Sequence, residues 1–176
     1  ADVLGVGAFS HTMTEATTAV AARVDIAITS GVSALVSTDM WAAKRAVLAM
    51  GMEQDNVGRV VGTALVVGAG DPQGGVAAEL LALVFHRLVV VDRSPDRLLS
   101  LRSRISARSP HCSVEVATHL DAHLANADLV VQGLAPGWQG AVALGELKTG
   151  AVLMDCSRPQ EVRVADAEAR PDVLIL

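Results

Sequence analysis

Aromatic side chains are scarce in this sequence of 176 residues, which contains two phenylalanines, two tryptophans and no tyrosine. A buried core must therefore be built from alanine, valine and leucine. Cysteine is scarce too, and Cys112 and Cys156 are too few for a disulfide scaffold or a zinc site. The five histidines show no metal-ligand spacing, so we expect no metal centre.

Two further absences limit the class of protein. No apolar run reaches the roughly 18–20 residues that cross a bilayer, and no basic-then-apolar leader opens the chain. We therefore expect a cytoplasmic protein without a membrane span. Basic residues are not in excess either, because the net charge is −5. This balance argues against a general nucleic-acid binder.

Hydrophobic residues make up 51% of the chain and charged residues 19%, which is enough apolar material for a buried core. From residue 60 onward, short runs of valine, leucine and isoleucine alternate with helical patterns. Continuous apolar strands separated by helices predict an α/β fold, a doubly wound parallel sheet of the Rossmann type. The expected strands are 63–67, 88–91, 113–117, 128–132, 151–155 and 172–176, and the expected helices are 74–85, 94–106 and 119–126.

The first 59 residues follow another pattern and are too few for a domain of their own. We expect them to be the tail of a preceding domain and a linking helix, followed by a dinucleotide-binding domain over 60–176. The chain starts with Ala1 and ends in an apolar segment, so we expect a piece of a longer protein whose exposed apolar surface favours a homodimer. The expected N-terminal elements are a helix over 12–23, a strand over 25–29 and a helix over 33–50, with Met40, Ala43, Val47 and Met50 on one apolar stripe.

A glycine-rich turn follows the first strand of the 60–176 domain and opens a helix, which is the context that a dinucleotide site needs. Gly68 permits a tight turn, Gly70 leaves room for a pyrophosphate, and the start of the helix binds negative charge. The third glycine is Gly74, one residue later than in the G-x-G-x-x-G pattern. The alternative is a tight turn that binds nothing. The predicted cofactor-binding residues here are Gly68, Ala69, Gly70, Asp71, Pro72, Gln73 and Gly74.

The end of the second strand should select between NAD and NADP. Asp92 lies 24 residues after Gly68, near the offset of about 20 at which an acidic residue binds the ribose hydroxyls of NAD. Arg93 and Arg97 follow, and both could hold the 2′-phosphate of NADP instead. For Arg97 the alternative is a solvated helix face. We expect NADP as the cofactor, with NAD as the alternative.

The loops after the fourth and fifth strands should lie near the nicotinamide and the substrate, because ligands bind at the carboxyl ends of parallel strands. Gly133, Leu134 and Ala135 belong to the first loop and Cys156 to the second. Cys156 is a candidate nucleophile or pocket wall. A lone cysteine is more often a small buried residue, which is the alternative here.

The order of these motifs resembles the cofactor domain shared by shikimate dehydrogenases, glutamyl-tRNA reductases and long-chain acyl-[acyl-carrier-protein] reductases. Two upstream stretches, LGVGAFS at 4–10 and ITSG at 28–31, resemble the acyl-carrier-protein reductases in particular. The motifs that carry the wider resemblance are ALVVGA at 64–69, VDRSPDRL at 91–98, ADLVV at 127–131 and VLMDCSRP at 152–159.

The resemblance implies that a cysteine thiolate attacks an acyl thioester, on an acyl-carrier protein or on coenzyme A, and that NADPH then reduces it to an aldehyde. In that family the cysteine lies a little beyond the last strand, so Cys156 does not match it. The family's second glycine falls where Asp71 stands, and Asp92 replaces a smaller residue. These departures leave two other hypotheses open: a shikimate- or glutamyl-type dehydrogenase, and a degenerate Rossmann domain with a regulatory or scaffolding role.

Overall fold

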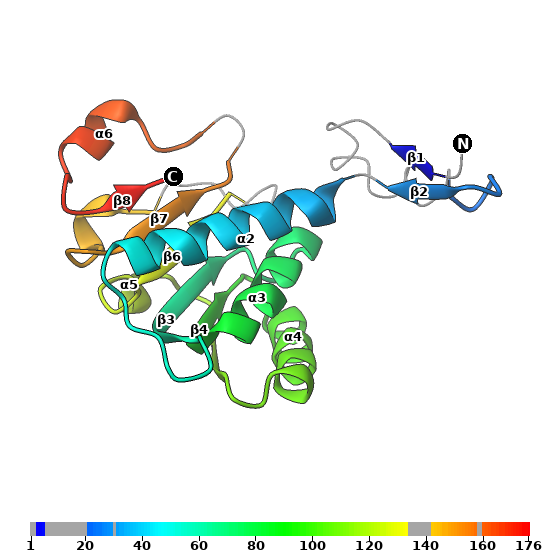
Figure 1. Ribbon diagram of the computed structural model, residues 1–176, viewed down its shortest axis with the longest axis horizontal. Coiled ribbons are helices and arrows are strands. Elements are labelled where there is room, and N and C mark those ends of the chain that lie inside the picture. Colours follow the sequence, from blue (N-terminus) through cyan, green and yellow to red (C-terminus); the bar gives the residue numbers. More distant parts are fainter. Residues whose placement is uncertain (1–2, 6–20, 30, 134–141, 158–159) are drawn as a thin grey trace.

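A six-stranded parallel sheet forms the centre of the protein in a computed structural model that describes residues 3–5, 21–29, 31–133, 142–157 and 160–176 (Figure 1). Its strand order is β5-β4-β3-β6-β7-β8. Successive strands are therefore added on one side of β3 up to β5 and on the other side from β6 onward. The predicted α/β fold is therefore confirmed, with the strand order of a Rossmann sheet. The strands are β3 (Val60–Val67), β4 (Phe85–Val91), β5 (Ser113–Ala117), β6 (Leu129–Gln132), β7 (Val152–Asp155) and β8 (Leu174–Ile175).

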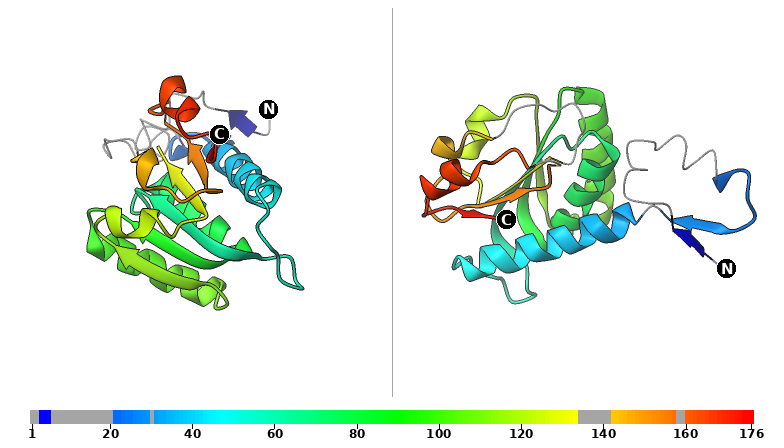
Figure 2. Two further views of the ribbon diagram at one scale, coloured as in Figure 1. Left: turned by 90° about the vertical axis from the view of Figure 1, so that its left-hand side faces the viewer. Right: turned by 90° about the horizontal axis from the view of Figure 1, so that it is seen from above.

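Helices cover both faces of this sheet, because its central strands present apolar side chains to both faces. Along β3, Ala64 and Val66 pack into one core cluster, whereas Leu65 and Val67 pack into another. The first cluster is closed by three helices, and the second by shorter elements (Figure 2). The elements of the first cluster are α2 (Val32–Ala49), α3 (Pro72–Val84) and α4 (Pro95–Arg108), and those of the second are α5 (Asp121–Leu124) and the 3₁₀ helix η2 (Leu144–Glu146).

Helix α2 packs its apolar stripe into the first cluster, where Met40, Ala43 and Val47 are buried. Met50, predicted on the same stripe, is instead 37% exposed because the helix has already ended at Ala49. Gly51 follows in the left-handed conformation (φ +94°), as expected of a glycine that terminates a helix. The helix predicted over 33–50 therefore belongs to the packed body of the fold.

The N-terminal strands stand apart from the main sheet. β1 (Val3–Gly5) pairs in parallel with β2 (Ala27–Thr29), and the pair extends beyond the amino end of α2, away from the six strands (Figure 1). Most of the helix predicted over 12–23 lies outside the described residues. The domain boundary at residue 59 remains a prediction. Among the described residues, no helix is both long enough and apolar enough to cross a membrane.

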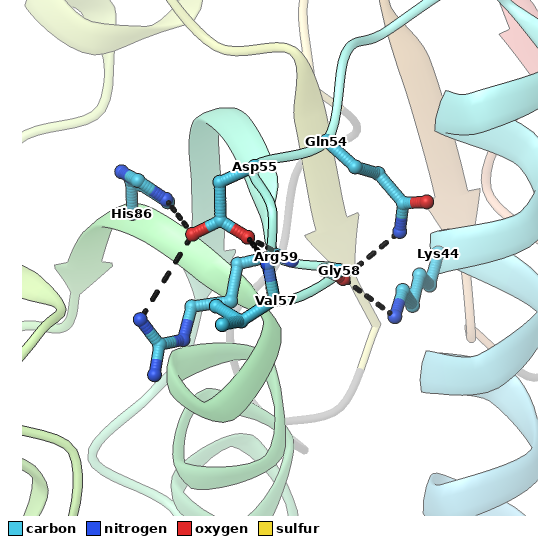
Figure 3. A network of polar contacts seen from close by, with 7 residues as sticks. All are labelled: Lys44, Gln54, Asp55, Val57, Gly58, Arg59 and His86. Atoms are coloured by element: carbon cyan, nitrogen blue, oxygen red, sulfur yellow. Dashed lines mark hydrogen bonds and ion pairs between the residues drawn. The ribbon is translucent and has the colours of Figure 1, made fainter.

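A polar network fastens the loop between α2 and β3 at the edge of the sheet where the strands begin (Figure 3). The Asp55 carboxylate accepts hydrogen bonds from the backbone N–H groups of Val57 and Arg59, at 3.0 and 2.8 Å, and contacts His86 Nε2 on β4 at 2.9 Å. The Arg59 backbone bond, followed by the His86 contact, lowers the pKa of Asp55 to about 2 against the opposing effect of burial. The Gly58 carbonyl accepts further bonds from Lys44 and Gln54.

Candidate functional site

The glycine-rich turn joins β3 to α3 at the edge of the sheet where the parallel strands end. Gly68 adopts a left-handed conformation (φ +74°), and the N–H groups of Gly68 and Ala69 both donate to the Val91 carbonyl at the end of β4. In α3, a Cβ at Gly74 would lie 2.2 Å from the Gly68 carbonyl oxygen. Gly74 therefore lets the helix approach the turn, which is the role of the third glycine of a dinucleotide-binding turn. Gly74 comes one residue later than in the G-x-G-x-x-G pattern, but it still allows this close packing of the helix against the turn.

Gly70 makes room for the side chain of Asp92. A Cβ at Gly70 would lie 2.6 Å from the Asp92 carboxyl carbon. The Gly70 N–H donates to one carboxylate oxygen at 3.2 Å, and the Ser94 N–H donates to the other at 2.9 Å. Asp92 is 7% exposed. Its carboxylate thus holds the glycine turn and the start of α4 together.

Asp71 is the N-cap residue of α3, and Pro72 follows at the first helical position. The Asp71 side chain makes no capping hydrogen bond, and one of its oxygens lies 3.9 Å from an Arg97 nitrogen on α4. Burial raises the pKa of Asp71, as does the negative charge of Asp92, while Arg97 acts in the opposite direction. An acidic side chain therefore occupies the helix start at which the sequence predicts a pyrophosphate.

An open groove of about 650 Å³ runs from this turn between α3 and α4. It brings together four predicted residues of the turn, 69–72, and Arg97, whose side chain is 64% exposed, whereas Gly68, Gln73 and Gly74 do not line it. A second arginine of the groove, Arg104, is paired with Glu79 at 2.9 Å. Arg93 is exposed directly after Asp92. The groove is lined by Ala69, Gly70, Asp71, Pro72, Gly75, Val76, Glu79, Asp96, Arg97, Ser100, Leu101 and Arg104.

The predicted loops meet where β6 and β7 end. Gly133 follows β6 with φ +78°, and a Cβ there would lie 2.1 Å from the Ser157 backbone nitrogen. The Cys156 N–H donates to the Gln132 carbonyl at 3.0 Å. Cys156 is half-buried, with its sulfur 3.9 Å from an Asp39 oxygen on α2. Leu134 and Ala135 lie outside the described residues.

A buried polar cluster beside these loops consists of Gln132, Asp155 and Ser157, to which the sequence analysis gives no role. Asp155 accepts backbone N–H bonds from Ser157, Glu161 and Val162 at 2.9–3.0 Å. Burial alone would raise the pKa of Asp155, but these bonds and the nearby polar groups of Ser157 and Gln132 lower it. Among the described residues, no group offers good hydrogen-bond geometry to the Ser157 hydroxyl or to the Gln132 amide nitrogen. Gln132 and Asp155 end otherwise apolar strands, and Ser157 follows two residues later, which is the signal in the sequence that could have identified this cluster.

The other candidate chemistry has little support in the described residues. No group of three His, Cys, Asp or Glu side chains among them is placed to hold a metal ion. Cys112 is buried, and burial raises the pKa of its thiol to about 11. Such a thiol is protonated at neutral pH and is a poor nucleophile.

Three solved structures with similar folds are a reductase and two dehydrogenases by their names. The ligand-free 5-ketofructose reductase of Gluconobacter sp. strain CHM43 superposes with a TM-score of 0.57 at 18% identity, over 79% of this chain and 50% of that one. Quinate dehydrogenase from Corynebacterium glutamicum, in complex with NAD, gives 0.55 at 20% identity, over 78% and 50%. Mycobacterium tuberculosis shikimate dehydrogenase gives 0.51 at 21% identity, over 78% and 50%.

These likenesses show the fold alone, and the chain spans about half the length of each of the three proteins. No protein-family model matches the sequence. No curated protein sequence matches it either.

Proposed function

We propose that this chain is the NAD(P)-binding domain of an oxidoreductase. The observation that carries the proposal is the glycine turn at the end of the first strand of a Rossmann-ordered sheet, next to the point where the strand order reverses. Gly68 and Gly74 give the close approach of helix and turn that such a site requires. The names of the similar structures, which include a reductase and two dehydrogenases, support the same class.

The residues of the turn fit a dinucleotide in two respects. The first turn of α3 presents backbone N–H groups that have no partner within the helix, and these suit a pyrophosphate. Beyond the turn, the cofactor would cross the carboxyl ends of the strands toward β6 and β7, where Gly133 and Cys156 lie. The nicotinamide, when bound, supplies hydride transfer. Asp71 is the residue that fits least well, because its negative charge opposes a phosphate.

NADP is our proposed cofactor in preference to NAD. Both carboxylate oxygens of Asp92 already accept backbone N–H groups, and the side chain is buried against Gly70. Its capacity to bind ribose hydroxyls is correspondingly reduced. Arg97 lines the groove beside the turn and offers its charge to a 2′-phosphate. Arg93 supports the same preference by its place directly after Asp92.

Reduction of an acyl thioester, with an acyl-carrier protein or acyl-CoA as partner, is a finer proposal that rests on the sequence motifs alone. Cys156 is a weak candidate for its nucleophile. Its sulfur lies 3.9 Å from an Asp39 oxygen, and a carboxylate is not the basic or cationic partner that activates a cysteine nucleophile. Homodimer formation is likewise a proposal.

A degenerate domain that binds no cofactor is the second candidate. The observation that favours it is the pair of carboxylates, Asp71 and Asp92, at the turn where a pyrophosphate would bind. A regulatory or scaffolding role within a larger protein would then explain a preserved fold with a weakened site.

Calorimetric titration with NADPH and NADH in parallel tests the proposal. We expect NADPH to bind more tightly than NADH, and Arg97→Gln to weaken NADPH binding about tenfold, because a charge-assisted contact to the 2′-phosphate is lost. NADH should be affected little. The matched control is Arg102→Gln, which removes the same charge from an exposed position on α4 outside the groove. Failure of both cofactors to bind at millimolar concentration would favour the degenerate domain.

A further inference from the structure

The place of Asp71 within the proposed cofactor site has a consequence for affinity and specificity. This residue stands at the amino end of a 13-residue helix, where the helix dipole favours an anion. Its carboxylate makes no capping hydrogen bond, although Asp is a residue that commonly caps helices. The side chain therefore contributes a negative charge at the turn without stabilising the helix start by the usual bond.

Across the groove, the same carboxylate lies 3.9 Å from Arg97 in the first turn of α4. Both residues line the groove, and the Asp71 side chain is 30% exposed against 64% for Arg97. The pair thus links the starts of α3 and α4, the two helices that form the groove. Any phosphate that enters there meets the charge of Asp71 and competes with it for Arg97.

We propose that Asp71 is a specificity-determining residue that weakens dinucleotide binding at the turn and competes with the 2′-phosphate for Arg97. This inference rests on the proposed function. Asp71 repels the pyrophosphate, which NAD and NADP share, and it competes for Arg97, whose partner only NADP carries. Its removal therefore strengthens the binding of both cofactors, and that of NADP by the larger factor.

Asp71→Asn is the test variant. It removes the charge but keeps the shape and an equally good N-cap residue, so the helix start should be preserved. In calorimetric titrations at low salt, we expect NADPH to bind about tenfold more tightly than to the unaltered chain and NADH about threefold more tightly. Both gains should shrink near 0.5 M salt, where exposed charges are screened over roughly 4 Å. Thermal unfolding of each variant verifies that it is folded.

Two further variants separate the position of Asp71 from charge in general. Asp96→Asn removes another negative charge that lines the groove, on the first turn of α4, and we expect it to have a clearly smaller effect. In an Arg97→Gln background, Asp71→Asn should strengthen NADPH and NADH binding equally, because Arg97 is no longer present to be released from Asp71.

Equal gains from Asp71→Asn and Asp96→Asn would refute the positional role of Asp71. Unchanged or weaker NADPH binding by a folded Asp71→Asn variant would refute the inference while leaving the proposed function standing, provided that the unaltered chain binds cofactor. If neither the unaltered chain nor Asp71→Asn binds at millimolar concentration, both the proposed function and this inference are wrong. Binding by Asp71→Asn alone would support this inference, and, because the unaltered chain then binds no cofactor, it would favour the degenerate domain over the proposed function.

Discussion

Two adjacent glycines of α3 allow the packing of the turn to be measured directly. Gly74 and Gly75 are both buried in the first turns of the same helix. A Cβ at Gly74 would lie 2.2 Å from the Gly68 carbonyl oxygen and 2.8 Å from its carbonyl carbon, which are backbone atoms that cannot rotate aside. The nearest atom to a Cβ at Gly75 is the Ala69 carbonyl oxygen at 3.5 Å, an ordinary contact.

Alanine at the two positions should therefore have opposite effects on stability. Gly75→Ala gains up to about 1 kcal/mol of helix propensity and meets no obstacle. Gly74→Ala gains the same propensity but must push α3 off the turn, and overpacking of this kind costs roughly 1–3 kcal/mol. The difference between the variants corresponds to roughly 2–12 °C in Tm for a chain of this length.

Urea unfolding followed by circular dichroism gives the free energy of unfolding, and NADPH titration of the same samples gives the effect on the site. We expect Gly74→Ala to be less stable than the unaltered chain and to bind NADPH less well, whereas Gly75→Ala should be slightly more stable than the unaltered chain. If Gly74→Ala is as stable as Gly75→Ala, then α3 does not approach Gly68 as closely as described, and the assignment of Gly74 as the third glycine of the turn is wrong.

Two other predictions concern parts of the fold away from the turn. Gly133→Ala should destabilise the chain more than Gly150→Ala. Both glycines have positive φ, so left-handed strain costs about 1–2 kcal/mol in both variants, but only the Cβ at Gly133 meets another backbone, at 2.1 Å. Equal losses of stability in urea unfolding would exclude the close Gly133–Ser157 contact. The pKa of Asp55 is lowered to about 2, so its contribution to stability is complete above its unfolded pKa and declines as the pH falls from about 4 through 2. The stability difference between the unaltered chain and Asp55→Asn, measured by urea unfolding at each pH, should shrink over that range.

The order and type of the elements after residue 60 could be predicted from the sequence because most of the strands contain a short run of apolar residues. β5 begins and ends at the predicted residues, and the helix predicted over 94–106 is α4, which begins at Pro95 with Ser94 as its N-cap. The weakest predictions were at the ends of short elements. The helix predicted over 119–126 is confined to Asp121–Leu124, and the strand predicted over 172–176 to Leu174–Ile175.

Contacts between segments that are distant in the chain could not be predicted from the sequence. Gly70 was expected to leave room for a pyrophosphate, and the structure shows that its missing side chain also accommodates Asp92, which lies 22 residues away. The pairing of Gly133 with Ser157 and the convergence of polar groups on Asp155 likewise depend on how β6 and β7 align. Such effects follow from register and packing, for which a local pattern carries no signal.

The shape of the glycine turn and the charge beside it make separate contributions to the candidate site, and variants at Gly74 and Asp71 distinguish the two. The late third glycine, Gly74, still gives the close helix–turn packing of a dinucleotide site, so the shape of the turn is preserved. Asp71 places a negative charge at this turn, and the positive charge of Arg97 offsets it. A chain whose site has degenerated by loss of shape would not recover cofactor binding when one charge is removed. A chain whose affinity is limited by charge would recover it with Asp71→Asn, and Gly74→Ala would then abolish the gain.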